Sequence, residues 1–456
     1  MQLKSVKFVL FYYVGIALFG GFLLSLPFAN NNPTTFVDAF FTAVSAITCT
    51  GLIVRDTGLD FTPAGQGIIL FLVQLGGFGY MIMLGLIYIL LRKKMSNSEK
   101  MMLKEIIYYN DLSNLHIFIR RVFLYVLIIE SIGAVFLSID FGYRFGFIEG
   151  IYHGIFHSIS AFNNAGFSTF SKNLLDFRED LIVNVVVSLL VIFGGLGYIC
   201  LIEIDLYLRD KIKATATTNA TILKRPFKFS FHFKIVIYTS VFLIFIGAIL
   251  FLFLEYNNPN TIGHFGIFDK VMTSIFTSIN LRSSGLGTIN IGDIKEQTAF
   301  FSTTFMFIGG APGGTTAGIR VTTFAILFAF FKGLLNGEQA RLFNRAIRYE
   351  DIQKALVIFL LAMIYFIVIA FLLVFVQLNI NFMDLAFEIV SALTNVGYSR
   401  GDGGVLSLVA NFNDAGKIIL AFSALLGKVG IILSLLALFG RFSTKRVNYI
   451  EERVLL

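Results

Sequence analysis

Long hydrophobic segments alternate with polar segments along the whole chain. Eight of the hydrophobic segments are almost free of charge and long enough to cross a bilayer, since a span needs roughly 20 apolar residues. They are residues 8–37, 61–91, 122–139, 181–202, 235–254, 297–331, 355–383 and 418–440. The pattern predicts an all-α membrane protein with eight transmembrane helices. The first segment is too long for a cleavable signal peptide, so we expect it to stay in the membrane.

The composition supports the same class. Hydrophobic residues make up 56% of the 456 residues and charged residues only 14%, whereas a typical soluble protein has about 25% charged residues. This excludes a soluble enzyme, a disordered chain and a secreted module held by disulfides. The two cysteines, Cys49 and Cys200, are expected on opposite sides of the membrane, so a disulfide between them is not expected.

The basic residues are concentrated in alternate connections between the spans. Residues 92–121, 209–234 and 332–354 hold 7, 7 and 5 Lys and Arg, and both termini add more. The positive-inside rule therefore predicts that both termini and these three connections are cytoplasmic. This distribution explains the net charge of +8 without a nucleic-acid partner, and the lipid bilayer is the expected environment.

Each outer connection contains an apolar segment that is too short to span and that ends in a polar cluster and a glycine. These glycines, Gly51, Gly166, Gly285 and Gly397, recur at intervals of 115, 119 and 112 residues. A second glycine cluster follows inside each next span. The repeating unit is a span, a re-entrant pore helix, a glycine loop and a second span. It predicts four repeats around one central pore, at residues 1–95, 96–213, 214–335 and 336–456, the last including a cytoplasmic tail.

Re-entrant backbone at membrane depth is tolerated only where it is buried in protein or lines water. Four converging loops would offer rings of backbone carbonyls, which is how a potassium filter replaces the hydration shell of the ion. Glycine permits the backbone angles that such a loop needs. The alternative is that glycines only let helices pack closely, and this is the main interpretation of the second cluster in each repeat.

Residues 45–52, 160–167, 280–286 and 391–398, together with the glycine-rich run 305–320, carry a family resemblance. They resemble the Trk/Ktr/HKT superfamily of potassium transporters, and the chain looks most like the bacterial Ktr-type membrane subunit. The resemblance implies the ion-conducting subunit of a potassium uptake system in the bacterial inner membrane, with K⁺ as the transported ion and no bound cofactor. It also implies a homodimer with one pore per subunit and a separate cytosolic nucleotide-binding regulatory ring.

The resemblance assigns the carbonyls of an ion-binding filter to four residues in each glycine loop. They are Thr48, Cys49, Thr50, Gly51, Asn163, Asn164, Ala165, Gly166, Arg282, Ser283, Ser284, Gly285, Thr394, Asn395, Val396 and Gly397. Sodium-transporting plant members have serine at the first filter position, so Gly51 favours potassium over a sodium-selective or mixed-cation member. Arg282 would repel a cation and is expected behind the filter, facing carbonyls or a carboxylate. Cys49 either exposes its thiol in the outer pore loop or points it behind the filter.

The run 309–318 breaks an apolar span and cannot form a good continuous helix. The functional interpretation is an intramembrane gate loop beneath the filter, and the alternative is a static packing break. The residues assigned to the gate are Gly309, Gly310, Pro312, Gly313, Gly314, Thr315, Thr316, Gly318 and Lys428. Lys428 lies within a span, so it either holds the loop through its carbonyls or tunes conduction electrostatically. A phosphate-binding loop is excluded, because the run lacks the Lys-Ser/Thr ending.

Other classes of membrane protein fit less well. A membrane enzyme would need clustered polar groups at one depth, but the histidines are scattered, so no enzyme activity is expected. A substrate-coupled secondary transporter often has inverted repeats, whereas these four are parallel. His153 and His157 lie one turn apart and are expected to pack rather than to bind metal. Glu130 lies within a span and is expected to face another helix, with no function assigned.

Overall fold

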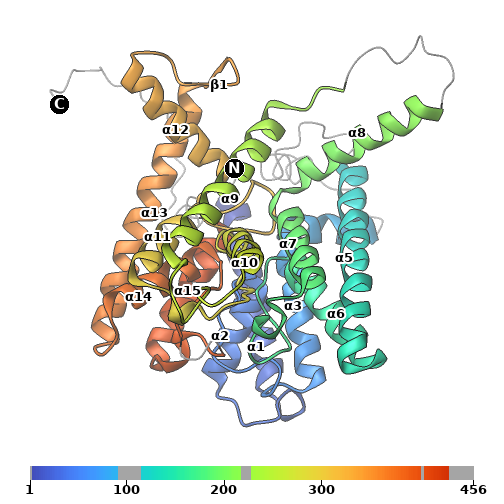
Figure 1. The fold of residues 1–456 in the computed structure, drawn as a ribbon, viewed down its shortest axis with the longest axis vertical. Helices are drawn as coiled ribbons and strands as arrows, with labels where there is room; N and C mark the ends of the chain where they lie inside the picture. Colours follow the sequence, from blue (N-terminus) through green and yellow to red (C-terminus); the bar gives the residue numbers. More distant parts are fainter. Residues whose placement is uncertain (1–2, 91–114, 217–226, 402–404, 431–456) are drawn as a thin grey trace.

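The computed structural model describes residues 3–90, 115–216, 227–401 and 405–430, and these residues are mostly helical (Figure 1). Most of the basic connection 92–121, part of the connection 209–234, the C-terminal tail and the end of the last predicted span lie outside the described residues. So does the predicted boundary between residues 95 and 96. The predicted boundary between residues 213 and 214 falls inside a helix.

Helices of similar length recur in the same order along the chain. The first group contains α1 (Leu3–Ser25), α2 (Phe36–Thr48) and α3 (Pro63–Leu90). The second contains α5 (Leu115–Phe145), α6 (Phe147–Phe162), α7 (Leu181–Gly195) and α8 (Tyr198–Ala216). The third contains α9 (Phe231–Glu255), α10 (Ile267–Asn280), α11 (Glu296–Met306) and α12 (Val321–Asn336). The fourth contains α13 (Tyr349–Val376), α14 (Phe382–Thr394) and α15 (Asp414–Val429).

The remaining regular structure is short. The two strands β1 (Arg341–Leu342) and β2 (Arg345–Ala346) form an antiparallel hairpin beyond α12, with Arg341 opposite Ala346. In the connections that the structure describes, four 3-10 helices lie between the main helices. They span Pro27–Ala29, Leu175–Phe177, Ile291–Asp293 and Leu408–Asn411.

The short helices α2 and α14 begin and end at local signals in the sequence. The side chain of Thr35 accepts a hydrogen bond from the amide of Asp38 at the start of α2, and Asn381 caps α14 in the same way. Both helices end at a residue in the left-handed conformation, Cys49 with φ 55° and Asn395 with φ 53°. Such a residue stops helical hydrogen bonding and turns the chain away from the helix axis.

Among the described residues, three helices are long and apolar enough to cross a membrane: α5, α9 and α13. The pair α7 and α8 adds a fourth if it counts as one span, although it is bent by 106°. The second long helix of the first three groups is interrupted: α3 is broken at Gly79, α7 and α8 are separated at Gly197, and the loop 309–318 separates α11 from α12. The arrangement of eight spans therefore stays a prediction.

Glycines of the second clusters serve two purposes. The first glycine of a cluster packs against the end of a short helix: a Cβ on Gly76 would lie 2.0 Å from the carbonyl oxygen of Ile47, and one on Gly194 would lie 1.8 Å from that of Phe162. The expected close packing is therefore present. A later glycine adopts a positive φ and breaks the helix, as at Gly197 with φ 82°, which the packing interpretation did not predict.

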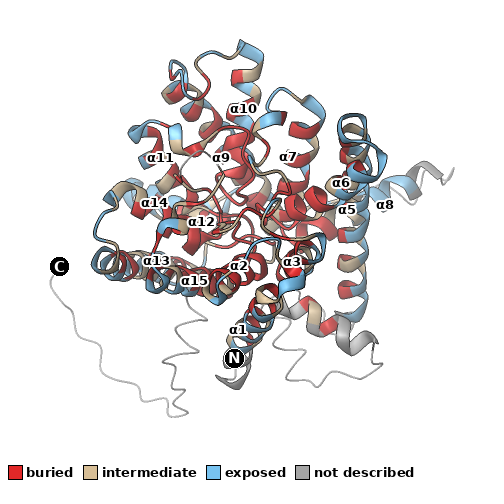
Figure 2. Ribbon diagram, turned by 90° about the horizontal axis from the view of Figure 1, so that it is seen from below, coloured by how far each residue is buried: buried red, intermediate tan, exposed pale blue. Residues whose placement is uncertain are grey.

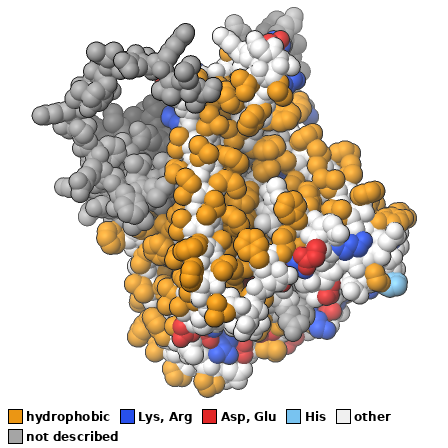
Figure 3. All heavy atoms as spheres, turned by 90° about the vertical axis from the view of Figure 1, so that its left-hand side faces the viewer, with side chains coloured by type: hydrophobic (Ala, Val, Ile, Leu, Met, Phe, Trp, Pro, Cys, Tyr) orange, Lys and Arg blue, Asp and Glu red, His pale blue; other side chains and the backbone are white. Residues whose placement is uncertain are grey.

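The outer faces of the long helices are apolar, and the buried residues gather at the centre. The helices α5 and α13 lie on opposite sides of the molecule, and the buried segments lie between them (Figures 1 and 2). Hydrophobic side chains cover most of the face shown in Figure 3, and Leu360, Phe371 and Phe375 of α13 are exposed. So large an exposed apolar surface is expected for a protein surrounded by lipid.

Candidate functional site

The four loop glycines lie against one another in a closed ring. A Cβ added to Gly51 would lie 3.0 Å from the Cα of Gly166, and one on Gly166 would lie 2.9 Å from the Cα of Gly285. A Cβ on Gly285 would lie 3.1 Å from the Cα of Gly397, and one on Gly397 would lie 3.0 Å from the Cα of Gly51. The structure therefore brings together all four loops that the sequence singled out, and only hydrogen atoms fit between them.

We call residues 48–51, 163–166, 282–285 and 394–397 the first to fourth glycine loops. The first, second and fourth follow the same backbone path. Their glycines have φ 86°, 75° and 90°, and the residues two positions earlier, Cys49, Asn164 and Asn395, have φ 55°, 56° and 53°. In the third loop Gly285 and Ser283 do not adopt positive φ, and α10 ends five residues before the glycine rather than three or four. The third loop therefore approaches the ring by a different route.

The amides of the first and fourth glycine loops are bonded back to the ends of their helices. The hydroxyl of Ser45 accepts from the amide of Gly51 at 3.1 Å, and the hydroxyl of Ser391 accepts from the amide of Gly397 at 3.0 Å. One residue earlier, the amide of Thr50 donates to the carbonyl of Ser45 at 2.8 Å. These backbone N–H groups of the glycine loops are therefore hydrogen-bonded to the ends of the short helices.

Almost all carbonyl oxygens of the glycine loops, in contrast, have no hydrogen-bond donor among the described residues. The residues of all four loops are buried. Within the described part of the chain, Gly285 is the single residue of the four loops whose carbonyl oxygen accepts a hydrogen bond. Buried backbone carbonyls are nearly always paired. An unpaired set that converges on one ring is therefore suited to bind a cation.

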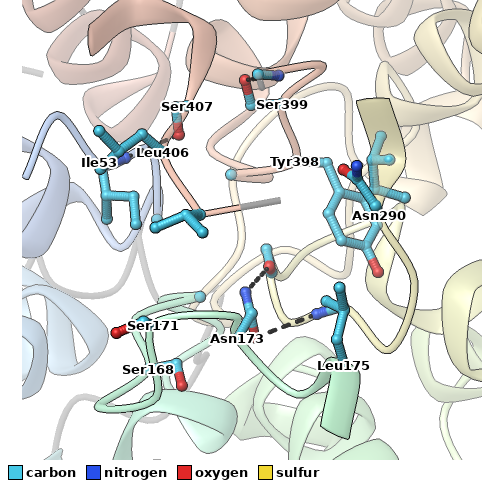
Figure 4. Close-up of a pocket in the computed structure, with 18 of the residues that line it drawn as sticks. Ile53, Ser168, Ser171, Asn173, Leu175, Asn290, Tyr398, Ser399, Leu406 and Ser407 are labelled. Carbon is cyan, nitrogen blue, oxygen red and sulfur yellow. Dashed lines mark hydrogen bonds between the residues drawn. The ribbon is translucent and has the colours of Figure 1, made fainter. Parts of the chain in front are cut away.

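A cavity of about 60 Å³ lies against the ring and is lined by all four glycines (Figure 4). Its other lining residues come from connections that follow the glycine loops, and they combine polar uncharged side chains, such as Ser168, Asn290 and Ser407, with a similar number of apolar ones. Asp56 contributes the acidic group among the described lining residues. The cavity therefore offers a hydrated approach to the ring.

Asn173 is a site residue that sequence reasoning missed. It follows the second glycine loop, yet its side-chain amide donates to the carbonyl of Gly285 in the third loop at 2.9 Å (Figure 4), and its oxygen accepts from the amide of Gly287 at 3.3 Å. Tyr398 adds a second link between loops, donating its hydroxyl to the carbonyl of Leu286 at 2.8 Å. Nothing in the sequence around Asn173 indicates this role, because its partners lie more than 110 residues away.

Arg282 points away from the ring. Its guanidinium is buried and donates to the carbonyl of Ser240 in α9 at 3.3 Å and to the carbonyl of Gly309 at 3.1 Å. Both acceptors are carbonyls, which is the orientation that the sequence predicted. Its supporting role behind the filter stays a prediction. The contact with Gly309 ties the third glycine loop to the start of the loop 309–318.

The two ends of the loop 309–318 are hydrogen-bonded to each other, and other parts of the chain contact the loop. A parallel bridge joins Ile308 to Ile319, and the amide of Gly309 donates to the carbonyl of Ile319 at 2.9 Å. The amide of Tyr198, at the start of α8, donates to the carbonyl of Gly313 at 3.1 Å. A Cβ on Gly318 would lie 3.2 Å from the Cβ of Thr394, so the loop also reaches the fourth glycine loop.

Thr315 joins the loop 309–318 to three distant segments. Its hydroxyl accepts from the side-chain amide of Asn164 at 2.5 Å, and its carbonyl accepts from the ammonium of Lys428 at 2.7 Å. Its own amide donates to the carbonyl of Gly194 at 3.2 Å. Lys428 therefore contacts the loop through a carbonyl, as one of the two interpretations of this lysine required. The second glycine loop touches the same threonine.

His153 and His157 pack in an aromatic cluster beside the second glycine loop. His157 lies 2.9 Å from the hydroxyl of Ser168, and the ring of Phe170 stacks on it with centroids 4.7 Å apart. His153 contacts the hydroxyl of Thr169 at 2.6 Å. In the described ranges, no group of three or more His, Cys, Asp and Glu residues could hold a metal ion.

Cys49 points its thiol behind the first glycine loop. It is 1% exposed, and its Sγ lies 3.6 Å from the carbonyl oxygen of Val73 in α3.

We expect a small thiol reagent added outside to leave Cys49 unmodified in the folded Cys200→Ser protein and to modify it after denaturation, as measured by mass spectrometry. Ile53→Cys, at a half-buried position that lines the cavity, should react in the folded protein. Rapid native labelling of Cys49 would contradict this placement.

Known proteins resemble this chain over nearly its whole length. The family described as TrkH, cation transport protein, matches residues 16–444. The Ktr system potassium uptake protein B of Bacillus subtilis is 32% identical over 96% of this chain and 93% of its own length. The protein of the same name from Vibrio alginolyticus is 30% identical over 98% of this chain and 94% of its own length. The potassium/sodium uptake protein NtpJ of Enterococcus hirae is 31% identical over 100% of this chain and 98% of its own length.

A solved structure has the same fold. The potassium transporter TrkH from Vibrio parahaemolyticus aligns with a TM-score of 0.68 over 96% of this chain and 85% of that chain, at 19% sequence identity.

Proposed function

Because this chain belongs to the TrkH family of cation transport proteins, we propose that it is the ion-conducting membrane subunit of a potassium uptake system. The observation that carries this proposal is the ring of four glycines together with the buried carbonyl oxygens of the glycine loops, which, apart from that of Gly285, accept no hydrogen bond from the described residues. A dehydrated K⁺ needs a shell of oxygen atoms, and backbone carbonyls supply one without a fixed charge that would trap the ion. The chain acts as a transporter and not as an enzyme.

The four glycine loops would form the selectivity filter of a single pore enclosed by four repeats and eight spans. Each loop follows the C-terminus of a short helix: α2, α6, α10 or α14. A helix C-terminus carries roughly half a negative elementary charge. Four such ends beside the filter stabilise a cation there, which supports the assignment of these loops as the ion-binding site.

The loop 309–318 would act as the gate beneath this filter. It contacts Thr394 on one side and is held by Lys428, Asn164 and Arg282 on the others. Each of these contacts is a hydrogen bond or a van der Waals contact that can break without disrupting a helix. The loop can therefore leave the conduction path when the surrounding helices shift.

The transporter would work as a homodimer in the bacterial inner membrane, with both termini in the cytoplasm and a cytosolic nucleotide-binding ring as its regulatory partner. Two observations support this assembly. Several relatives are named as parts of a Ktr system, which indicates additional components. The Lys and Arg residues are concentrated in the connections predicted to be cytoplasmic, where positive charge can attract a cytosolic partner.

A mixed potassium and sodium transporter is the second candidate. The relative from Enterococcus hirae is named a potassium/sodium uptake protein and covers the whole chain. The glycine at the first filter position favours potassium, and competition between the two ions in uptake assays separates the two candidates.

Rescue of growth tests the proposed function. We expect expression of this chain to restore growth of a bacterium that lacks potassium uptake systems at limiting K⁺, and a candidate regulatory subunit to increase the effect. Gly397→Val is the matched control, because its Cβ would lie 2.0 Å from the carbonyl oxygen of Thr50. The proposal fails if the wild-type protein reaches the membrane but supports neither growth nor K⁺ uptake.

A further inference from the structure

Glu130 is buried in the middle of α5, a helix that is long and apolar enough to cross a membrane. Its Oε1 accepts from the side-chain amide of Asn163 at 2.9 Å, and its Oε2 accepts from the side-chain amide of Gln74 at 3.2 Å. Asn163 also donates to the side-chain oxygen of Gln74 at 3.0 Å. The three side chains form a closed triangle between α5, α3 and the second glycine loop.

The hydrogen bonds of this triangle suit an ionised carboxylate. Both carboxylate oxygens accept N–H groups, and an ionised carboxylate is an acceptor only. Each of the two carboxylate oxygens faces an N–H donor, so the triangle can hold the carboxylate after its proton has left. The side chain of Asn163 is tightly enclosed, since a Cβ on Gly77 would lie 1.6 Å from its Oδ1.

Glu130 has no basic partner in the part of the chain that the structure describes, where every ion pair involves other acidic groups. A buried charge without a counter-charge is strongly unfavourable. A cation in the filter can bring a positive charge towards this carboxylate, because Asn163, which is bonded to Glu130, begins the second glycine loop. Carbonyl oxygens of that loop lack hydrogen-bond donors among the described residues.

Two cationic side chains, the buried Arg282 and the half-buried Lys428, lie beside the same loops. Arg282 stands behind the third glycine loop, and Lys428 lies against Cys49 of the first. A K⁺ entering the filter adds a further positive charge to a region of low dielectric constant. A carboxylate in this region offsets that repulsion.

We propose that the carboxylate of Glu130 is a counter-charge for the cation in the filter and thereby sets the affinity for K⁺. This inference rests on the proposed function. Glu130 does not touch the ion, and it acts through Asn163 as a positioning residue and through space as a fixed negative charge. For unit charges about 10 Å apart at an effective dielectric constant of about 20, Coulomb's law gives a roughly tenfold effect on affinity.

The test separates the charge of Glu130 from its hydrogen bonds. Glu130→Gln removes the charge and keeps the shape, whereas Gln74→Leu keeps the charge and removes two hydrogen bonds of the triangle. Two quantities are measured: the KM for K⁺ uptake in cells, and the K⁺ concentration that half-maximally stabilises the purified full-length protein against heat. For Glu130→Gln we expect both to rise about tenfold, with a much smaller change in Vmax.

Glu130→Asp and Gln74→Leu should keep both values near those of the wild type, because the charge remains, even where Vmax or thermal stability falls. An unchanged K⁺ midpoint in folded Glu130→Gln would overturn the proposal. If Glu130→Gln does not accumulate in the membrane, the test uses the two variants that keep the charge, Glu130→Asp and Gln74→Leu. A tenfold rise of the K⁺ midpoint in both of these variants then overturns the proposal. Absence of any K⁺ response in the wild-type protein would contradict the proposed function rather than this inference.

Discussion

Gly51→Ser is expected to lower the selectivity for K⁺ over Na⁺ by about tenfold. Gly51 has φ 86°, and a Cβ there would lie 2.5 Å from the carbonyl oxygen of Ala165. The left-handed backbone alone destabilises a residue with a side chain by about 1–2 kcal/mol, and the clash pushes the second glycine loop away. A wider ring holds K⁺ less well and discriminates less against Na⁺, which raises the permeability of Na⁺ relative to K⁺.

Ion fluxes in proteoliposomes measure this change. Gly285→Ser is the matched comparison, because Gly285 lies in the same ring but does not adopt a positive φ. It should lose less selectivity than Gly51→Ser, since its Cβ would approach the backbone of Gly397 to 2.9 Å, whereas a Cβ on Gly51 would lie 2.5 Å from a carbonyl oxygen. An unchanged ratio of the two ion fluxes in Gly51→Ser would show that this glycine does not determine selectivity.

Deletion of residues 312–316 is expected to raise the K⁺ flux by about tenfold, which corresponds to a barrier lowered by about 1.4 kcal/mol. The deletion removes Thr315 and with it the contacts with Asn164 and Lys428 that hold the loop 309–318 in place. Control by the cytosolic partner should weaken for the same reason. Selectivity should largely persist, because the four ring glycines remain.

Lys428→Ala should act in the same direction with a smaller effect, since Thr315 keeps its bonds to Asn164 and Gly194. Lys428→Arg is its control, because arginine can still donate to the carbonyl of Thr315. Fluxes with and without the regulatory subunit, compared at equal amounts of protein in the membrane, provide the measurement. A folded deletion variant with wild-type flux and wild-type regulation would mean that the segment is a packing break.

The features that could be predicted from the sequence are those that repeat. The spacing of Gly51, Gly166, Gly285 and Gly397 singled out the four segments that meet in the ring, because close approach of backbones leaves no room for a side chain. The uncharged spans and the basic connections indicated a membrane protein in the same way. Both kinds of pattern are properties of short segments and are visible without knowledge of tertiary contacts.

The features that could not be predicted depend on contacts between distant segments. Nothing near Asn173 indicates that it bonds to Gly285, and nothing near Glu130 indicates that Asn163 and Gln74 face it. The glycine clusters of the second spans were ambiguous, because one residue type serves both close packing and a helix break. Which of these a glycine does is decided by its neighbours in space.

The loop 309–318 restricts the number of identical subunits from which the proposed pore could be built. The loop bonds to Asn164, Gly194 and Lys428, which belong to different parts of one polypeptide. Its neighbour Arg282 is the first residue of the third glycine loop, and the same position is occupied by Thr48 in the first loop and by Asn163 in the second. A pore built from four identical chains would carry four copies of every such element, and four copies of this loop would compete for one axis. Covalent joining of the four proposed repeats in one polypeptide would remove that symmetry, so that each repeat could diverge to a separate task.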